Sequence, residues 1–458
     1  MGGLRRNTEL GLILLATVIT GGTYVLASLG STNSVPADIG TFLGLVLALL
    51  VVAHIATRRL APNADGLLLP LAGLLNGLGY VFIARVDNVS CWPPWDPPGD
   101  SNCLAGLQAT WTLLGIVGFV GTLLVVRRTR MLERYRYTAA LAGLLLLLLP
   151  LAPVIGREIN GSRIWVSFGP VNFQPGEFAK IALAVFFAGY LIEKRELLAV
   201  ASFRVGPLML PDPKHLGPVV VAWAASVLVM VFERDLGSSL LFFTLFMVLL
   251  WVATERVAYL VVGSSLFAGG AWLAWMRFSH VQRRVDVWIN PWEDPKDAGF
   301  QILEAAFSLA SGGITGTGPG LGDPGKIPKA ETDFIFAVIG EELGLLGASA
   351  VIIAFVLMVG AGLRIAIRAE DGFEKLLATG LTTLLGVQSF IIIGGVIRLL
   401  PLTGVTLPFV SYGGSSLVAN YVLLALLLRV SDETSKRVAR QASWAGSGYA
   451  EEDADVSV

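Results

Sequence analysis

Residues 331–363, ETDFIFAVIGEELGLLGASAVIIAFVLMVGAGL, place acidic side chains directly before a long and mainly apolar run. A helix that crosses a lipid bilayer needs about 20 predominantly apolar residues, and this run exceeds that length. Similar runs recur from residue 9 to residue 429, with no soluble stretch of domain length between them. The sequence therefore predicts an all-α, polytopic membrane protein.

The composition agrees with a membrane protein and excludes several other classes. Of the 458 residues, 54% are hydrophobic and 15% are charged, whereas soluble proteins average about 25% charged residues. A net charge of −1 argues against a nucleic-acid partner bound by bulk electrostatics. Three His and two Cys are too few for a Cys/His metal cage.

We expect about twelve transmembrane helices. They are predicted at residues 9–29, 37–57, 66–84, 105–126, 138–155, 176–193, 215–233, 237–253, 257–276, 334–363, 376–397 and 412–428.

The loops between these helices predict how the chain sits in the cell membrane. Most of the 33 Lys and Arg residues fall on one side when both termini are placed in the cytoplasm, as positively charged cytoplasmic loops require. We divide the chain into N-terminal transmembrane helices (1–135), a core (136–430) that includes a long external loop (277–333), and a disordered cytoplasmic tail (431–458).

The predicted external loop 86–104 contains both cysteines, Cys91 and Cys103. An oxidising exterior permits a disulfide that closes this loop. The alternative is two free thiols.

The segment 160–180, NGSRIWVSFGPVNFQPGEFAK, is the first external region with unexplained polar residues. Arg163 is a candidate ligand for an anion, and Trp165 is either an interfacial aromatic or part of a substrate site. Glu177 and Lys180 lie three residues apart just inside a predicted helix, where ionisable side chains are costly and are usually functional or paired. The two either serve a substrate or neutralise each other.

Two further external regions join predicted helices. Asp235 belongs to the charged cluster 233–237, which is either a solvated tight turn or a site for a lipid headgroup. Residues 401–416, PLTGVTLPFVSYGGSS, contain Ser411 and Ser415 and predict non-helical backbone, which membrane depth tolerates only inside protein or beside a wet cavity. Arg398 precedes this segment and is a candidate partner for an anion.

The long loop 277–333 ends at Asp333, directly before a predicted helix. Asp333 is either a simple helix N-cap or a general base facing an aqueous cavity, and one carboxylate can do both. Within the loop, residues 300–313 suit a helix lying at the membrane surface. The glycine-rich run 312–325 resembles a P-loop but lacks its Ser or Thr and a preceding strand, so we interpret it as tight turns or a close substrate approach.

Five segments, in this order, resemble the SEDS family of shape, elongation, division and sporulation proteins, the RodA/FtsW group. They are NGSRIWVSFGPVNFQPGEFAK, RDLGSSL, NPWEDPKDAGFQ…SGGITGTGPGLG, ETDFIFAVIGEELGLLG and PLTGVTLPFVSYGGSSL. The resemblance covers about residues 140–430. The stretches RRNTELGL and GGVIRLLPLTG are similar to actinobacterial RodA-like members, and two additional N-terminal helices preceding a ten-helix core fit the same group.

The resemblance implies a peptidoglycan glycosyltransferase that polymerises lipid II into β-1,4 glycan strands during cell elongation and shape maintenance. It places the family's catalytic aspartate at Asp333. It also implies a class B penicillin-binding protein as partner, together with the elongation machinery. Glu331 stands where the family often has His, and an extra carboxylate there is expected to raise the pKa of Asp333.

The implied reaction needs positive charge for a departing pyrophosphate. We expect it from Arg163, Arg398, Lys180 or an oxygen-ligated Mg²⁺ or Mn²⁺ ion. The alternatives are a lipid II flippase, the FtsW-type division paralogue, and a non-catalytic scaffold. A flippase needs polar access from both leaflets, whereas the polar residues gather on one side.

Overall fold

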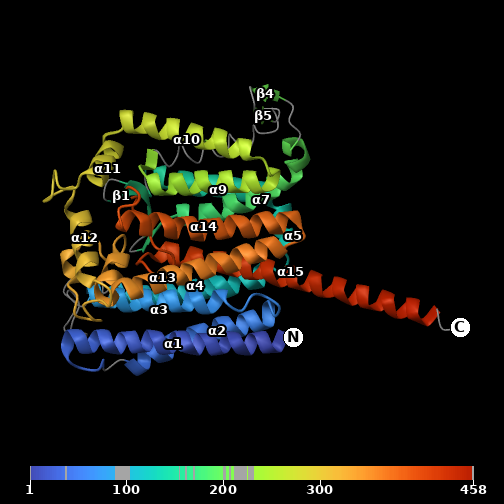
Figure 1. Cartoon of the computed structure of the whole chain (residues 1–458), viewed down its shortest axis with the longest axis horizontal. Helices are drawn as coiled ribbons and strands as arrows, with labels where there is room; N and C mark the ends of the chain where they lie inside the picture. The colour runs from blue at the N-terminus through green and yellow to red at the C-terminus, as the bar shows by residue number, and fades with distance from the viewer. Residues whose placement is uncertain are drawn as a thin grey trace.

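A computed structural model describes residues 2–36, 39–87, 104–153, 155–159, 162–168, 171–199, 203–205, 208–210, 224 and 232–455. Long helices lie side by side with their axes roughly parallel (Figure 1). These helices are α1 (Gly2–Thr32), α2 (Ile39–Leu60), α3 (Leu68–Asp87), α4 (Leu104–Val125), α6 (Arg136–Leu148), α7 (Gly176–Ala199), α9 (Leu236–Thr254), α10 (Val257–Arg277), α13 (Ile335–Arg368), α14 (Gly372–Val396) and α15 (Gly414–Asp455).

The all-α, polytopic architecture predicted from the sequence is confirmed. Among the described residues, 9 helices are long and apolar enough to cross a membrane. Two more, α6 and α7, coincide with predicted spans: α6 is short, and α7 carries charged residues at both ends. The predicted span at 215–233 lies almost wholly outside the described residues, as do Cys91 and Cys103, so neither the total of twelve nor the disulfide is tested.

Shorter elements gather at the two ends of the bundle. The helices α11 (Ser279–Ile289) and α12 (Phe300–Gly312) lie at one end, with the 3₁₀ turn η2 (Pro324–Lys326) in the same loop. The helix α5 (Thr129–Arg134) and the paired strands β4 (Phe203–Val205) and β5 (Leu208–Leu210) lie at the other end, which also holds the N-terminus. The 3₁₀ turn η1 (Leu149–Leu151) continues α6.

The helix predicted at residues 300–313 is present as α12. Ile302 and Leu303 are buried and α12 packs on α13, whereas Phe307 is 52% exposed. Part of the apolar face of α12 therefore covers the protein instead of a membrane surface.

The segment 160–180 contains strands that the helix-based prediction missed. β1 (Gly156–Ile159), β2 (Ser162–Phe168) and β3 (Val171–Phe173) form an antiparallel sheet in that order. In the register, Arg157 faces Trp165 and Ser167 faces Asn172. Strand residues alternate between the two faces of a sheet, and Val166 is fully buried between two half-buried neighbours.

The glycine-rich run completes a break inside α13. Gly344 has a left-handed φ of 66°, which interrupts the helix. An interrupted helix leaves backbone groups without intrahelical partners, and the run supplies them. Thr317 N donates to Glu341 O (2.9 Å), and Leu345 N donates to Gly313 O (3.0 Å). The tight-turn interpretation of the run is confirmed, because Gly316 and Gly320 also have positive φ values of 87° and 81°.

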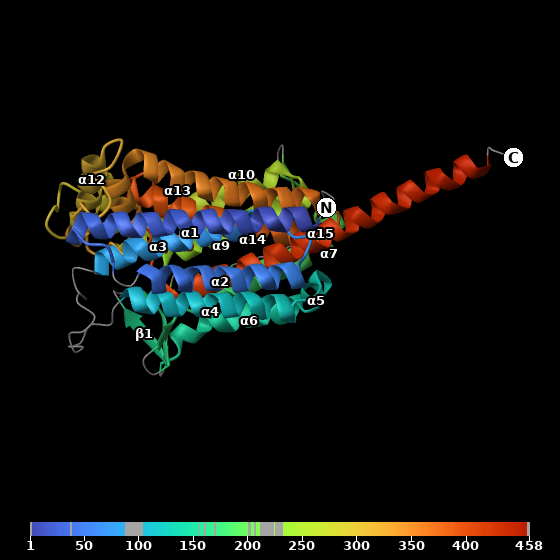
Figure 2. The same cartoon turned by 90° about the horizontal axis from the view of Figure 1, so that it is seen from below.

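The prediction of a disordered tail at 431–458 is wrong for its first part. Helix α15 continues to Asp455 and extends beyond the bundle in both views (Figures 1 and 2). Asp432 is fully buried and accepts from Asn63 N (2.8 Å), while the preceding Arg429 donates to Leu60 O (2.7 Å) and Leu123 O (2.6 Å). These polar residues satisfy the ends of α2 and α4, which is why a polar stretch is ordered here.

Candidate functional site

Asp333 belongs to a short non-helical segment that neighbouring backbone holds in place. Tyr412 N donates to Glu331 O (2.8 Å), and Ser411 Oγ donates to Thr332 O (2.5 Å). The N-cap of α13 is Phe334, so the interpretation of Asp333 as that cap is wrong. Its carboxylate is therefore not used to satisfy the helix end.

The surroundings of Asp333 change its acidity. Burial raises the pKa of Asp333 from 3.8 to about 6, and Glu331 adds to the rise. Arg284 and Lys329 act in the opposite direction. A β-carbon placed on Gly404 would lie 3.9 Å from Asp333 Oδ2, so the 401–416 segment passes directly beside the carboxylate. A carboxyl group with a pKa near 6 is suited to accept a proton at neutral pH.

Helix α11 is fastened to the segment beside Asp333. The Arg284 guanidinium donates to Thr403 O (3.0 Å) and Leu402 O (3.5 Å). One turn later, the Trp288 indole donates to Arg398 O (3.0 Å), and the Arg398 guanidinium donates back to Trp288 O (3.1 Å). Arg398 is therefore tied to the α11 backbone, although the sequence suggested it as an anion ligand.

Lys180 and Glu177 form the pair that their spacing suggested. Lys180 Nζ donates to Glu177 Oε2 (2.8 Å) and to Gln388 Oε1 (2.8 Å) on α14. Gln388 Nε2 donates in turn to Thr406 O (2.8 Å). Glu177, Lys180 and Gln388 are all buried. This chain of hydrogen bonds links α7 and α14 to the 401–416 segment that borders Asp333.

The other predicted site residues take different positions. Ser415 Oγ accepts from Gln174 N (2.9 Å), which joins the segment after β3 to the start of α15. Asp235 caps α9, accepting from Ser238 N (3.0 Å) and Ser238 Oγ (2.6 Å). Arg163 and Trp165 are half-buried on β2. The structure thus brings Ser411 next to the Asp333 segment, whereas Asp235 and Ser415 have structural hydrogen bonds.

Two acidic residues of α13 hold the glycine-rich run against α3. Glu342 is fully buried, accepts from Gly320 N (2.7 Å) and pairs with Arg85 (3.2 Å). Arg85 also donates to Gly320 O and Gly322 O, both at 2.9 Å. These contacts of Arg85 and Glu342, which we call the Arg85 clasp, hold the loop that leads into Asp333.

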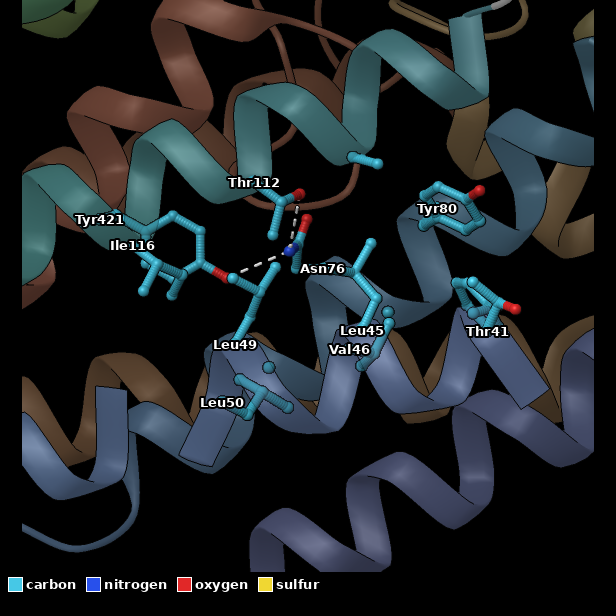
Figure 3. Close-up of a pocket in the computed structure, with 14 residues that line it drawn as sticks. Thr41, Leu45, Val46, Leu49, Leu50, Asn76, Tyr80, Thr112, Ile116 and Tyr421 are labelled. Atoms are coloured by element: carbon cyan, nitrogen blue, oxygen red, sulfur yellow. Dashed lines mark hydrogen bonds between the residues drawn. The ribbon is translucent and has the colours of Figure 1, made fainter. Parts of the chain in front are cut away.

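A separate pocket of about 160 Å³ lies between α2, α3, α4 and α15 (Figure 3). Its lining is mostly apolar. The Asn76 amide donates to Thr112 Oγ1 (3.2 Å) and to the Tyr421 hydroxyl (3.1 Å) on one wall. The pocket contains none of the predicted site residues.

Sequence reasoning missed Arg284, Gln388 and Gly404. A polar amide inside an apolar run is a recognisable signal, and Gln388 carries it. Arg284 is one of several basic residues in a long loop, and its spacing gave no indication of a contact about 120 residues further along the chain.

Comparison with known proteins defines the class. The sequence model of the cell cycle protein family of FtsW, RodA and SpoVE matches residues 66–436, and the chain belongs to this family. Helices α1 and α2 precede the matched residues, in agreement with the two additional N-terminal helices expected from the sequence.

Individual relatives are more specific. The peptidoglycan glycosyltransferase RodA of Mycobacterium tuberculosis is 45% identical over 429 residues, which cover 93% of this chain and 90% of that protein. The probable peptidoglycan glycosyltransferase FtsW of Geobacter metallireducens is 36% identical, covering 80% of this chain and 94% of the relative.

Solved structures agree with these sequence matches. One chain of a peptidoglycan synthase complex that coordinates polymerization and crosslinking superimposes with a TM-score of 0.64 at 27% identity, covering 81% of this chain and 98% of that one. The Rod shape determining protein RodA of Thermus thermophilus gives a TM-score of 0.54 at 25% identity, covering 80% of this chain and 96% of that one.

Proposed function

We propose that this protein is a peptidoglycan glycosyltransferase of the RodA type, which polymerises lipid II in the cell membrane. The observation that carries the proposal is the Asp333 carboxylate, which backbone contacts hold outside α13 with a pKa of about 6. The names of the mycobacterial relatives support the same activity, and their identity exceeds that of the FtsW relatives.

Asp333 acts as the general base in this proposal. The sugar hydroxyl of the acceptor attacks the anomeric carbon of the donor and gives its proton to the Asp333 carboxylate. The bond between that carbon and the pyrophosphate oxygen breaks, and the lipid pyrophosphate leaves with the bonding electrons. A single positioned general base contributes roughly 10²–10⁴-fold to a rate.

The leaving pyrophosphate requires positive charge. Lys180 and Arg398 already have protein partners, whereas for Arg163 the described residues supply no ion-pair partner. Among the residues that the structure describes, no group of three His, Cys, Asp or Glu side chains is placed to hold a metal. We therefore propose that a Mg²⁺ or Mn²⁺ ion arrives with the phosphates, because Mg²⁺ is usually bound by substrate phosphates, several waters and only one or two carboxylates. Full polymerisation in EDTA would contradict this part.

The proposed function also includes a partner protein and an orientation in the membrane. We propose a class B penicillin-binding protein as the crosslinking partner, supported by the likeness to a synthase complex that couples polymerization to crosslinking. Both termini are placed in the cytoplasm, which puts Asp333 at the outer face. Its support is the bias of Lys and Arg in the loops.

The test is polymerisation of lipid II by the purified full chain with its partner. Asp333→Asn is expected to lower the rate by roughly 10²–10⁴-fold. Burial disfavours the ionised carboxylate, so this variant should unfold at the same or a higher temperature than the wild type at pH 8. Asp323→Asn is the matched control, because its side chain is 59% exposed and lies in the same loop. Near-normal polymerisation by Asp333→Asn contradicts the role of Asp333 as general base, and a wild-type chain that does not polymerise lipid II contradicts the proposed activity.

A further inference from the structure

Arg284 occupies a position that the reaction outlined above does not yet use. It is half-buried on α11 and its guanidinium donates to the carbonyl oxygens of Leu402 and Thr403. The next residue, Gly404, has a φ of 75° and lies against Asp333 Oδ2. The Arg284 guanidinium and the Asp333 carboxylate thus both border residues 402–404.

The other arginine on this part of α11 provides a contrast. Arg283 precedes Arg284 directly and is exposed. Trp288, one turn after Arg284, binds the same segment at Arg398. Arg284 and Trp288 therefore lie on the face of α11 that donates hydrogen bonds to residues 398–403. Arg283 points away from this face, because neighbouring residues on a helix are about 100° apart.

We infer that Arg284 is a positioning residue: it holds the 402–404 backbone beside Asp333 and brings a positive charge to the side of this segment that faces α11. The inference rests on the proposed function. It assigns to Arg284 a role in tuning the base, distinct from binding the pyrophosphate.

The sign of the pH effect follows from the charges around Asp333. Burial and Glu331 raise the pKa of Asp333, while Arg284 and the exposed Lys329 lower it. Among the described residues, these are the charged groups that act on it, and Arg284 opposes burial more strongly than Lys329 does. Removing the Arg284 charge should therefore raise the pKa further, so that ionisation requires a higher pH. An opposite charge nearby typically shifts a carboxyl pKa by about 1–3 units.

The experiment measures kcat for lipid II polymerisation between pH 5 and 9 with the full chain and its partner. In Arg284→Gln, the acid limb of the profile should move upward by about one pH unit. The rate should recover toward its plateau at pH 9, and KM should change less than kcat at pH 6. Arg284→Lys keeps the charge and should restore the wild-type limb, and Arg283→Gln should leave the profile unchanged.

A thermal-unfolding cycle at pH 8 keeps the inference falsifiable even where Arg284→Gln is too unstable for kinetics. The loss of stability caused by Arg284→Gln should be larger with Asp333 present than in the Asp333→Asn background, because coupled residues are not additive. Equal losses in both backgrounds, or an unshifted acid limb in Arg284→Gln, would overturn the inference. Should Asp333→Asn retain activity, Asp333 is not the base and the role of Arg284 fails with it. Should the wild type not polymerise lipid II, the proposed function itself fails, whatever Arg284 does.

Discussion

Lys180 shows how single residues connect the site to the helices. Its ammonium is buried and bonded to Glu177 and Gln388. A buried ion pair contributes little relative to apolar packing, but removing one partner leaves an uncompensated charge, which costs about 3–5 kcal/mol. A single substitution in the Glu177–Lys180 pair therefore costs more stability than the pair itself contributes.

We expect Lys180→Met to lower the free energy of unfolding by about 3–5 kcal/mol, since it strands the Glu177 carboxylate. The double variant Glu177→Gln/Lys180→Met should recover much of that loss. Thermal unfolding in detergent measures both variants. Lys194→Met, at the more exposed end of the same helix, is the control and should change stability by less than about 1 kcal/mol. A double variant that is no more stable than Lys180→Met would contradict the argument.

For single residues, the sequence predicted side-chain contacts within one helix and missed the contacts between different elements. The three-residue spacing predicted the Glu177–Lys180 pair, and the family resemblance of the segment ETDFIFAVIGEELGLLG singled out Asp333. The Arg398 prediction placed its guanidinium toward an anion, but the structure bonds it to Trp288 in another element. Spacing within one helix fixes which side chains are neighbours, whereas the approach of α11 to residues 398–403 depends on tertiary packing.

Among the elements, α13 and the glycine-rich run depend on each other. The break at Gly344 exposes backbone groups that the run satisfies, and Arg85 on α3 fastens the same run through Gly320, Gly322 and Glu342. The loop before Asp333 is thus held from two helices.

Arg85→Met should loosen this loop, because it removes two hydrogen bonds to the run and leaves the Glu342 carboxylate without its cation. The expected result is faster trypsin cleavage after the exposed Lys326 and Lys329, with the rest of the digestion pattern preserved. Arg277→Met, at the end of α10, is the control. Cleavage rates equal to those of the wild type would show that the Gly-rich backbone holds its shape without the Arg85 clasp.

The helical elements were largely predictable, because apolar runs report membrane spans directly. The strands β1–β3 were missed, since their alternation is short and lies in a loop between two much stronger helix signals. The ordered start of the tail was missed for a different reason. Its polar residues look solvated in the sequence, yet Asp432 and Arg429 serve the ends of other helices.

For the whole molecule, the arrangement of the ends bears on the orientation. The N-terminus and the C-terminal helix lie toward the same end of the bundle, and α11 and α12 lie at the opposite end (Figure 1). This arrangement agrees with the Lys and Arg bias of the loops, which predicts both termini on the same side of the membrane.

The orientation is testable by labelling intact cells with a membrane-impermeant maleimide in a Cys91→Ser/Cys103→Ser background. A cysteine at Lys326, which is exposed at the end of η2, should be labelled from outside. A cysteine at Ala439, exposed on α15, should react only after the cells are permeabilised. The opposite pattern would invert the topology and remove Asp333 from the outer face.

The hydrogen bonds that hold the segment containing Asp333 have an evolutionary consequence. The bond from Tyr412 N to Glu331 O joins main chain to main chain, and Ser411 also reaches a main-chain oxygen. Such bonds persist when the side chain at position 331 drifts, provided that the backbone N–H of residue 412 is not lost to proline. A lineage can therefore exchange His for Glu at position 331 and so change the pKa of Asp333. The backbone bonds that position the Asp333 carboxylate stay the same.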